Sequence, residues 1–194
     1  MNRRALLTGM ATTVATTIAL GGCLRPEYRT ALLDETGTGS VGAAYSLAAG
    51  DKLRVIVFGQ DNLSNIYAVD GAGRIALPLI GPVKVAGGST AQAARAIEAR
   101  LRDGYVREPH VTVEVEVYRP FFILGEVTTS GQYPYVSGMT VETAVAIAAG
   151  FGPRAARDYA VVTREGPTGL VSGIVPMTYP VRPGDTIVVK ERWF

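Results

Sequence analysis

A single cysteine, Cys23, ends a short apolar segment at the beginning of the 194-residue chain. This segment opens with Arg3 and Arg4 and continues as a run of sixteen mostly apolar residues, Ala5 to Leu20. A helix that crosses a bilayer needs about 20 apolar residues, so the run is too short for a comfortable transmembrane span. A positive start followed by a short apolar run is typical of a secretory signal peptide, and we expect residues 1–22 to be one.

The residues around the end of this segment indicate lipidation. Leu20-Gly21-Gly22-Cys23 resembles a lipobox, in which small side chains flank the cleaved bond and the thiol carries a diacylglycerol. We predict cleavage between Gly22 and Cys23 and a lipid anchor on Cys23, because two or three acyl chains hold a protein stably to a membrane. The alternative is an ordinary signal peptide followed by a chance cysteine.

The residue after the cysteine bears on the destination. Leu24 stands where an aspartate would retain a lipoprotein in the inner membrane. We therefore expect a lipid anchor in the outer membrane, with the body of the protein facing the periplasm. Arg3-Arg4 weakly resembles a twin-arginine signal, and both the general secretory route and the twin-arginine route stay open.

The composition beyond the signal segment favours a neutral globular body. Apolar residues make up 47% of the chain and charged residues 19%, which argues against disorder. The 19 Lys and Arg residues include Arg3 and Arg4, so 17 remain after cleavage against 17 Asp and Glu residues. No basic cluster with interleaved aromatic residues is present, and nucleic-acid binding is not expected.

Residues 23–44 are polar and small and lack a strand or helix period, so we expect a lipidated flexible tether. The tether contains Gly37-x-Gly39-x-x-Gly42, which matches a dinucleotide-binding fingerprint by letter. That fingerprint must follow a strand and open a helix, so that the helix N-terminus receives the pyrophosphate. Neither condition is met here, and we expect no cofactor.

A first β-rich module is expected over residues 45–118. Its predicted helix begins at a capping box formed by Ser89 and Gln92 and has Ala94, Ile97 and Leu101 on one face. An i,i+4 ion pair between Glu98 and Arg102 is expected on its solvated face. The predicted strands are 52–58, a hairpin over 68–78 around Asp70-Gly71, 80–85, and 110–118.

Arg119-Pro120 breaks the strand pattern and marks the start of a second module over residues 119–194, expected to be β-grasp-like. Strands are expected at 121–127, 132–136, 159–164 and 186–190. Thr140 is predicted to cap a short helix whose apolar stripe is Val141, Ala144, Val145 and Ala148. The predicted class is thus α+β: two small β-rich modules, each with a short helix.

Two patterns occur twice in the chain. Tyr45-x-Leu47-x-x-Gly50-Asp51 resembles Tyr179-x-Val181-x-x-Gly184-Asp185, and a Gly-Asp turn launches an apolar strand in both. Gly88-x-Thr90 with its following alanines recurs as Gly138-x-Thr140. These echoes favour two related modules, although reuse of the same turn chemistry is the alternative.

Candidate catalytic groups are few. Glu114 and Glu116 lie on the polar face of the strand 110–118 with no apolar pocket to raise either pKa, so we interpret them as surface residues. His110, the only histidine, follows Pro109 at a strand start and is expected to have a turn or packing role. No triad or metal-ligand cluster is recognisable, and we predict no catalytic and no metal-binding residue.

Several segments together resemble one family. Three segments look like the polysaccharide export domain of outer-membrane polysaccharide export proteins. They are Tyr45-Ser-Leu-Ala-Ala-Gly-Asp-Lys-Leu, Leu77-Pro-Leu-Ile-Gly-Pro-Val and Arg107-Glu-Pro-His-Val-Thr-Val. A later segment and the predicted helix that Thr140 caps look like the soluble-ligand-binding β-grasp module of that family. The segment is Phe122-Ile-Leu-Gly-Glu-Val-Thr-Thr-Ser-Gly-Gln-Tyr. The resemblance covers about residues 45 to 194.

The resemblance implies a non-catalytic subunit of a periplasmic homo-oligomeric ring, through which capsular polysaccharide or exopolysaccharide passes from an inner-membrane copolymerase. Longer members of the family add a C-terminal amphipathic helix that lines the outer-membrane pore. No such stretch follows Val189, so we expect either a separate outer-membrane barrel or a periplasmic collar beneath the membrane. Trp193 and Phe194 could equally dock on a partner or pack on their own module.

Other interpretations remain. Arg154, Arg157 and Arg164 could line a lumen or touch an anionic sugar, but a solvated surface is the preferred interpretation. The main rival function is a monomeric glycan- or peptidoglycan-binding lipoprotein without a transport role. A periplasmic enzyme acting on polysaccharide would need two carboxylates in a cleft, which the sequence does not indicate.

Overall fold

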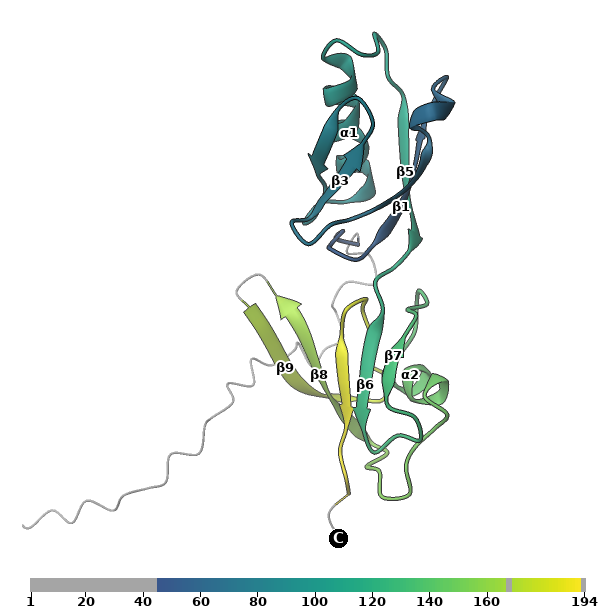
Figure 1. Ribbon diagram of the computed structural model, residues 1–194. Coiled ribbons are helices and arrows are strands. Elements are labelled where there is room, and N and C mark those ends of the chain that lie inside the picture. Colours follow the sequence, from purple (N-terminus) through teal and green to yellow (C-terminus); the bar gives the residue numbers. More distant parts are fainter. Residues whose placement is uncertain (1–44, 167–168, 193–194) are drawn as a thin grey trace, which may run out of the picture.

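The computed structural model describes residues 45–166 and 169–192, which form two β-rich modules arranged end to end (Figure 1). The chain passes from the first module to the second through Tyr118, Arg119 and Pro120, between the last strand of one and the first strand of the other. Each module has one α-helix and its own buried core. The α+β class with two small β-rich modules, each with a helix, is therefore confirmed.

The first module contains a three-stranded antiparallel sheet in the order β2-β1-β5 and a separate two-stranded sheet formed by β3 and β4. Its elements are β1 (Lys52–Val57), a 3-10 turn (Asp61–Leu63), β2 (Asn65–Ala68), β3 (Arg74–Leu77), β4 (Gly81–Lys84), α1 (Thr90–Arg102) and β5 (Val111–Val117). Leu53, Val55 and Val57 alternate along β1 and are fully buried, because successive strand residues point to opposite faces. They meet Ile97 and Leu101 of α1 in the core.

Helix α1 begins as predicted. The Ser89 hydroxyl accepts the N–H of Gln92, and the Gln92 side chain accepts the N–H of Ser89, which completes the capping box. The buried stripe contains Ala93 rather than Ala94, together with Ile97 and Leu101. The helix is therefore rotated slightly from the predicted face.

Glu98 does not form the predicted pair with Arg102. Its carboxylate accepts the backbone N–H of Val111 at 3.0 Å, and no Glu98–Arg102 ion pair occurs among residues 45–166 and 169–192. This bond fastens α1 to the first residue of β5. The partner comes from the tertiary structure, which helix periodicity does not reveal.

The predicted hairpin over residues 68–78 is wrong, although its turn exists. Asp70 accepts the backbone N–H groups of Ala72 and Arg74 at 2.9 and 2.8 Å, which closes the turn. The strands on either side separate, since β2 pairs with β1 while β3 pairs with β4. The turn therefore connects two sheets instead of two partners in one sheet.

The second module contains a five-stranded mixed sheet in the order β7-β6-β10-β8-β9. Its elements are β6 (Phe121–Gly125), β7 (Gly131–Tyr133), α2 (Val141–Ile147), β8 (Tyr159–Gly166), β9 (Gly169–Pro176) and β10 (Thr186–Val189). Strands β6 and β10 are parallel, and the other neighbours are antiparallel. Strand β9 was not predicted from the sequence.

One face of this sheet carries the second core. Phe121, Ile123, Val162 and Ile187 are fully buried and pack with the apolar face of α2. Thr140 caps α2 as predicted, with its hydroxyl accepting the N–H of Thr143. The predicted helix stripe is also buried: Val141, Ala144, Val145 and Ala148 are each at most 1% exposed.

Candidate functional site: the junction between the modules

A buried carboxylate, Asp51, lies where the first module meets the connecting residues. Its oxygens accept the Tyr45 hydroxyl at 2.8 Å, the N–H of Ala48 at 2.9 Å and the N–H of Arg119 at 2.9 Å. The residue is 0% exposed. A buried charge is tolerated only when it is paired and hydrogen-bonded, and these donors meet that condition.

Arg119 connects this carboxylate to the second module. Its guanidinium donates to the Tyr45 hydroxyl at 2.9 Å, lies 3.5 Å from the Asp51 carboxylate and sits over the Tyr45 ring. Arg119 also lies against Gly184, where an added Cβ would come within 2.7 Å of its Nε. Since Gly184 belongs to the turn before β10, one side chain contacts both modules.

A second buried aspartate occupies the matching position in the second module. Asp185 is 0% exposed and accepts two bonds from Arg164, Nε to Oδ1 at 2.8 Å and Nη2 to Oδ2 at 2.6 Å. It also accepts the N–H of Arg182 at 2.8 Å. The Arg164 guanidinium lies over the Tyr179 ring, 5.6 Å from its centroid. Such a two-pronged arginine–carboxylate pair is both strong and geometrically specific.

The two networks use the same local geometry, as the repeated sequence pattern indicates. Gly50 and Gly184 both adopt positive φ, at 91° and 85°, which favours glycine over other residues. In each turn the glycine N–H and the aspartate carbonyl bond to a neighbouring segment, namely Val69 in the first module and Pro120 and Phe122 in the second. Thus both copies of the pattern place an arginine on a buried aspartate and a tyrosine on that arginine. Tyr45 also donates to Asp51 directly, whereas Tyr179 accepts from Arg164 at 3.4 Å.

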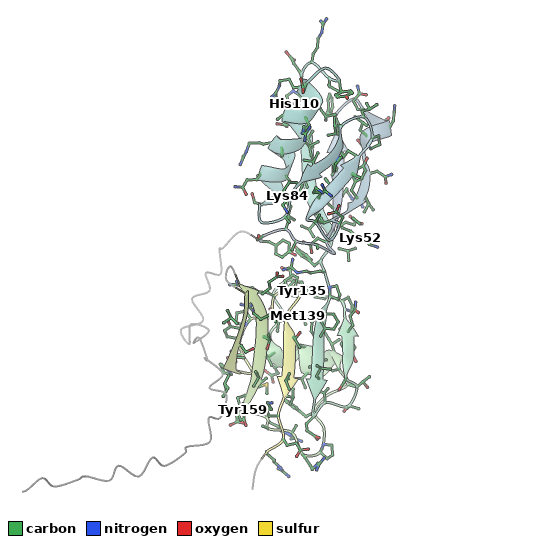
Figure 2. All side chains as sticks on the ribbon, turned by 60° about the vertical axis from the view of Figure 1, so that its left-hand side comes forward. Lys52, Lys84, His110, Tyr135, Met139 and Tyr159 are labelled. Atoms are coloured by element: carbon green, nitrogen blue, oxygen red, sulfur yellow. The ribbon has the colours of Figure 1, made fainter. Side chains whose placement is uncertain are left out.

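Three tyrosine rings extend the contact across the junction. Tyr118 packs edge-on against Tyr45, with ring centroids 4.9 Å apart, and against Tyr135, with centroids 5.4 Å apart. Tyr135 lies at the end of the second module that faces the first (Figure 2). The junction is therefore packed with aromatic side chains, and the modules are not joined by the chain alone.

The acidity of Tyr45 follows from this environment. Burial, and then the hydrogen bond to Asp51, raise its pKa well above the ordinary value of 10.0. The raised pKa in the folded state means that the neutral phenol stabilises the fold fully below pH 10.0, and that this contribution decreases as the pH rises beyond it.

Replacing Tyr45 with phenylalanine should lower the free energy of unfolding by about 1–3 kcal/mol at neutral pH, because a hydrogen bond to a charged group is lost. The difference between the wild-type protein and Tyr45→Phe should stay constant up to about pH 10 and should shrink as the pH rises from there to about pH 11. Urea unfolding at each pH measures both effects. A difference that stays constant over this interval would show that the phenol proton does not contribute to stability.

The residues singled out in the sequence lie in different places. Gly22 and Cys23, with the whole signal segment and tether, lie outside the described residues. Glu114 and Glu116 lie on the outer face of β5, as expected of surface residues, and Arg54 donates to Glu116 at 2.8 Å. That hydrogen bond lowers the pKa of Glu116.

Arg154, Arg157 and Arg164, for which a solvated surface was the preferred interpretation, differ from one another. Arg164 is not solvated surface, since its side chain is only 14% exposed and bonds Asp185. Arg154 is exposed and pairs with Glu191 at 3.0 Å, while Arg157 lies over the ring of Phe151. The structure therefore does not gather the three into one site.

His110 lies at the end of the first module that is remote from the second (Figure 2). With Ile56 and Phe58 it lines a shallow hollow on the outer side of β1 and β5. In the described part of the chain, no group of three His, Cys, Asp or Glu residues is placed to hold a metal ion. Within the same residues, none of the helices has the length and apolarity needed to span a membrane.

Sequence reasoning missed both buried aspartates. It identified the Gly-Asp turns as launching points for strands, but not as buried charges. The signal was the tyrosine six residues before each aspartate, which occurs in both copies of the pattern. The arginines could not be assigned, because Arg119 lies 68 residues after Asp51 and Arg164 lies 21 residues before Asp185.

Comparisons with known proteins match both modules. Residues 40–116 match the family described as polysaccharide biosynthesis/export protein, and residues 120–175 match the SLBB domain. The two matches adjoin at the junction and together cover well over half of the chain. The chain belongs to the polysaccharide export protein family.

Similar curated proteins carry related names. The exopolysaccharide production protein ExoF of Rhizobium meliloti is 34% identical over 59% of this chain and 31% of its own length. The EPS I polysaccharide export outer membrane protein EpsA of Ralstonia nicotianae is 31% identical over 83% of this chain and 43% of its own. The polysialic acid transport protein KpsD of Escherichia coli is 27% identical over 63% of this chain and 22% of its own. The chain thus matches less than half the length of each relative.

Proposed function

We propose that this protein is a non-catalytic subunit of an oligomeric conduit that exports capsular polysaccharide or exopolysaccharide. The observation that carries the proposal is the tandem family match, with a polysaccharide export sequence on the first module and an SLBB sequence on the second. The names of the relatives, which refer to exopolysaccharide production, polysaccharide export and polysialic acid transport, support the same role.

The proposed setting is the periplasmic side of the outer membrane. The name of EpsA, an outer membrane protein, supports this location. The anchor is lipid on Cys23, and the tether 24–44 joins it to the first module. The partners are further copies of the same chain in a ring, an inner-membrane polysaccharide copolymerase and, if the ring is a collar, a separate outer-membrane barrel.

A deletion strain complemented with two versions of the gene tests this proposal. Wild-type protein should restore polymer outside the cell, whereas deletion alone should stop its appearance while synthesis continues. Cys23→Ser should leave most of the protein in the soluble periplasmic fraction, because its lipid is absent, and should restore little secretion. Membrane fractionation and assay of extracellular polymer measure the two effects.

Each possible failure has a separate meaning. If deletion leaves secretion unchanged, the export role is wrong. If Cys23→Ser stays membrane-bound and fully active, the lipid anchor is wrong and another contact holds the protein. The rival role, a monomeric glycan- or peptidoglycan-binding lipoprotein, predicts normal secretion in the deletion strain.

A further inference from the structure

Strand β9 forms one margin of the five-stranded sheet, and within residues 45–166 and 169–192 it pairs only with β8 (Figure 1). Its eight residues, Gly169–Pro176, read Gly-Leu-Val-Ser-Gly-Ile-Val-Pro and include no charged side chain. A long uncharged edge strand exposes a row of backbone groups that can pair with another chain. Proteins usually protect such an edge against pairing with other chains, unless the edge is a binding surface.

The other edge strands of the two larger sheets have the usual protection. In the first module, β5 carries Glu114 and Glu116, and β2 is only four residues long. In the second module, β7 at the opposite margin has three residues and is followed by Pro134. Charges and short length limit strand addition, whereas Pro134 after β7 and Pro176 at the end of β9 only shorten the segment that can pair. Among these edges, β9 is the one that is both long and uncharged.

The backbone orientation of β9 leaves donors at the open margin. Proline has no N–H, so in a sheet its nitrogen faces away from the neighbouring strand. Pro176 is opposite Tyr159 in the β8–β9 ladder. Residues at two-residue spacing share this orientation, and the N–H groups of Ser172 and Ile174 therefore point to the open margin.

Beside this margin, two rows of side chains on the sheet face are also uncharged, with the exposed Glu165 next to them on β8. The register aligns two rows of side chains across four strands, Leu124-Val188-Val161-Ile174 and Phe122-Thr186-Thr163-Ser172. Several of these apolar groups are exposed: Phe122 by 40%, Leu124 by 46% and Ile174 by 64%. The opposite face holds the core with α2. We name these eight residues the open face.

We propose that β9 and the open face form the surface on which a second copy of this chain docks, with a strand of that copy extending the sheet at β9. The inference deepens the proposed function, since it names the subunit contact of the conduit. An uncharged surface is complemented best by another uncharged surface, because burying an unpaired charge against it is costly. The strand at the opposite margin, β7, offers Gly-Gln-Tyr, which is also uncharged.

The strand directions favour β7 of the neighbouring copy as the partner of β9. Strand β6 is parallel to β10, while β7 is antiparallel to β6, and β8 is antiparallel to both β10 and β9. Strands β9 and β7 consequently run in opposite directions. Two copies in the same orientation would therefore join β9 to β7 as an antiparallel pair. Such head-to-tail contacts use two different surfaces and close into a ring when the rotation permits.

The test compares two lysine substitutions in the full chain, extracted from membranes in mild detergent. Ile174→Lys places a charge on β9 and the open face, whereas the control Leu79→Lys changes an equally exposed residue in the first module, since both are 64% exposed. We expect wild-type protein and Leu79→Lys to give the same oligomer by native mass spectrometry. Ile174→Lys should shift most of the protein to monomer while keeping its circular dichroism spectrum.

A cysteine pair identifies the contacting edges. The double variant Ser172→Cys with Gln132→Cys should give a ladder of covalent dimers, trimers and larger species after oxidation in membranes, and each single variant should give none. A dimer from Ser172→Cys alone would overturn the head-to-tail arrangement. Wild-type protein, which retains only Cys23, serves as the control.

Three outcomes overturn the docking surface. They are a wild-type chain that remains monomeric at high concentration, an Ile174→Lys protein that assembles like wild type, and a monomer whose β9 amides are already protected from hydrogen exchange by another segment of its own chain. Secretion separates these outcomes from failure of the proposed function. If export depends on the gene while Ile174→Lys assembles and secretes normally, the function stands and this surface is wrong.

Discussion

Replacing Asp185 with alanine is expected to lower the free energy of unfolding by about 3–5 kcal/mol, because it leaves the buried guanidinium of Arg164 without its counter-charge. The carboxylate accepts hydrogen bonds from Nε and Nη2 of that guanidinium and from the backbone N–H of Arg182, and it is fully buried. Removing one partner of a buried pair leaves the other charge uncompensated. Urea unfolding of the purified protein, followed by circular dichroism, measures the loss.

Glu116→Ala is the matched control for this experiment. Glu116 also pairs with an arginine at 2.8 Å, but the pair with Arg54 is exposed to solvent on both sides. Water screens exposed pairs, so this change should have a far smaller effect than Asp185→Ala. If the two substitutions destabilise the protein equally, burial does not make the Asp185 network important.

A double variant distinguishes the contribution of the buried charges to stability from the contribution of side-chain packing. Replacing Asp185 and Arg164 together with apolar residues of similar size should recover much of the stability lost in Asp185→Ala, because no buried charge remains. A double variant as unstable as the single one would indicate that the hydrogen bonds to Arg182 and Pro180 matter more than the ion pair.

Local sequence signals predicted the helices and most strands of this fold. The capping boxes at Ser89 and Thr140 act within three residues, so a short window of sequence contains the whole signal. The valine alternation of β5 also holds at its centre, with Val113 buried. It fails at Val117, which is 46% exposed, because the β1–β5 register shifts between Lys52 and Leu53.

Strand β9 could not be predicted because its stability comes from neighbours. Gly169, Ser172 and Gly173 interrupt the branched residues that a sequence pattern requires, and glycine lowers strand preference. Pairing with β8 over the full length of β9, together with burial of Val175, stabilises the strand nonetheless. The hairpin over 68–78 failed for a related reason: a turn sequence specifies a reversal, but not which strands pair.

The buried aspartates illustrate the same limit at the candidate site. Aspartate after glycine is an ordinary turn residue, so the Gly-Asp dipeptide alone does not indicate that Asp51 and Asp185 are inaccessible to water. Their burial depends on arginines that the fold supplies from distant positions. The repeated Tyr-Asp spacing was visible, and in retrospect it is the strongest local sign of both networks.

Replacing Asp51 with alanine is expected to destabilise the first module by about 3–5 kcal/mol and to loosen the junction at the same time. The variant loses the acceptor of the Tyr45 hydroxyl and of the Arg119 N–H, and it leaves the Arg119 guanidinium partly buried without a carboxylate. Hydrogen exchange should show lost protection in β1, β2 and the connecting residues. Small-angle scattering should show a broader range of module orientations.

The two aspartate variants control each other, because they occupy equivalent turns in different modules. Asp185→Ala should expose amides of β6, β8 and β10 while β1 and β5 remain protected, and Asp51→Ala should show the reverse pattern. Asp70→Ala, at an exposed turn of the first module, should change neither the junction nor the scattering.

If Asp51→Ala leaves the scattering unchanged, the tyrosine rings and the covalent connection suffice to fix the modules. If it broadens the orientations and also reduces polymer secretion from the complemented deletion strain, then a fixed angle between the modules is required for the subunits to assemble into a passage.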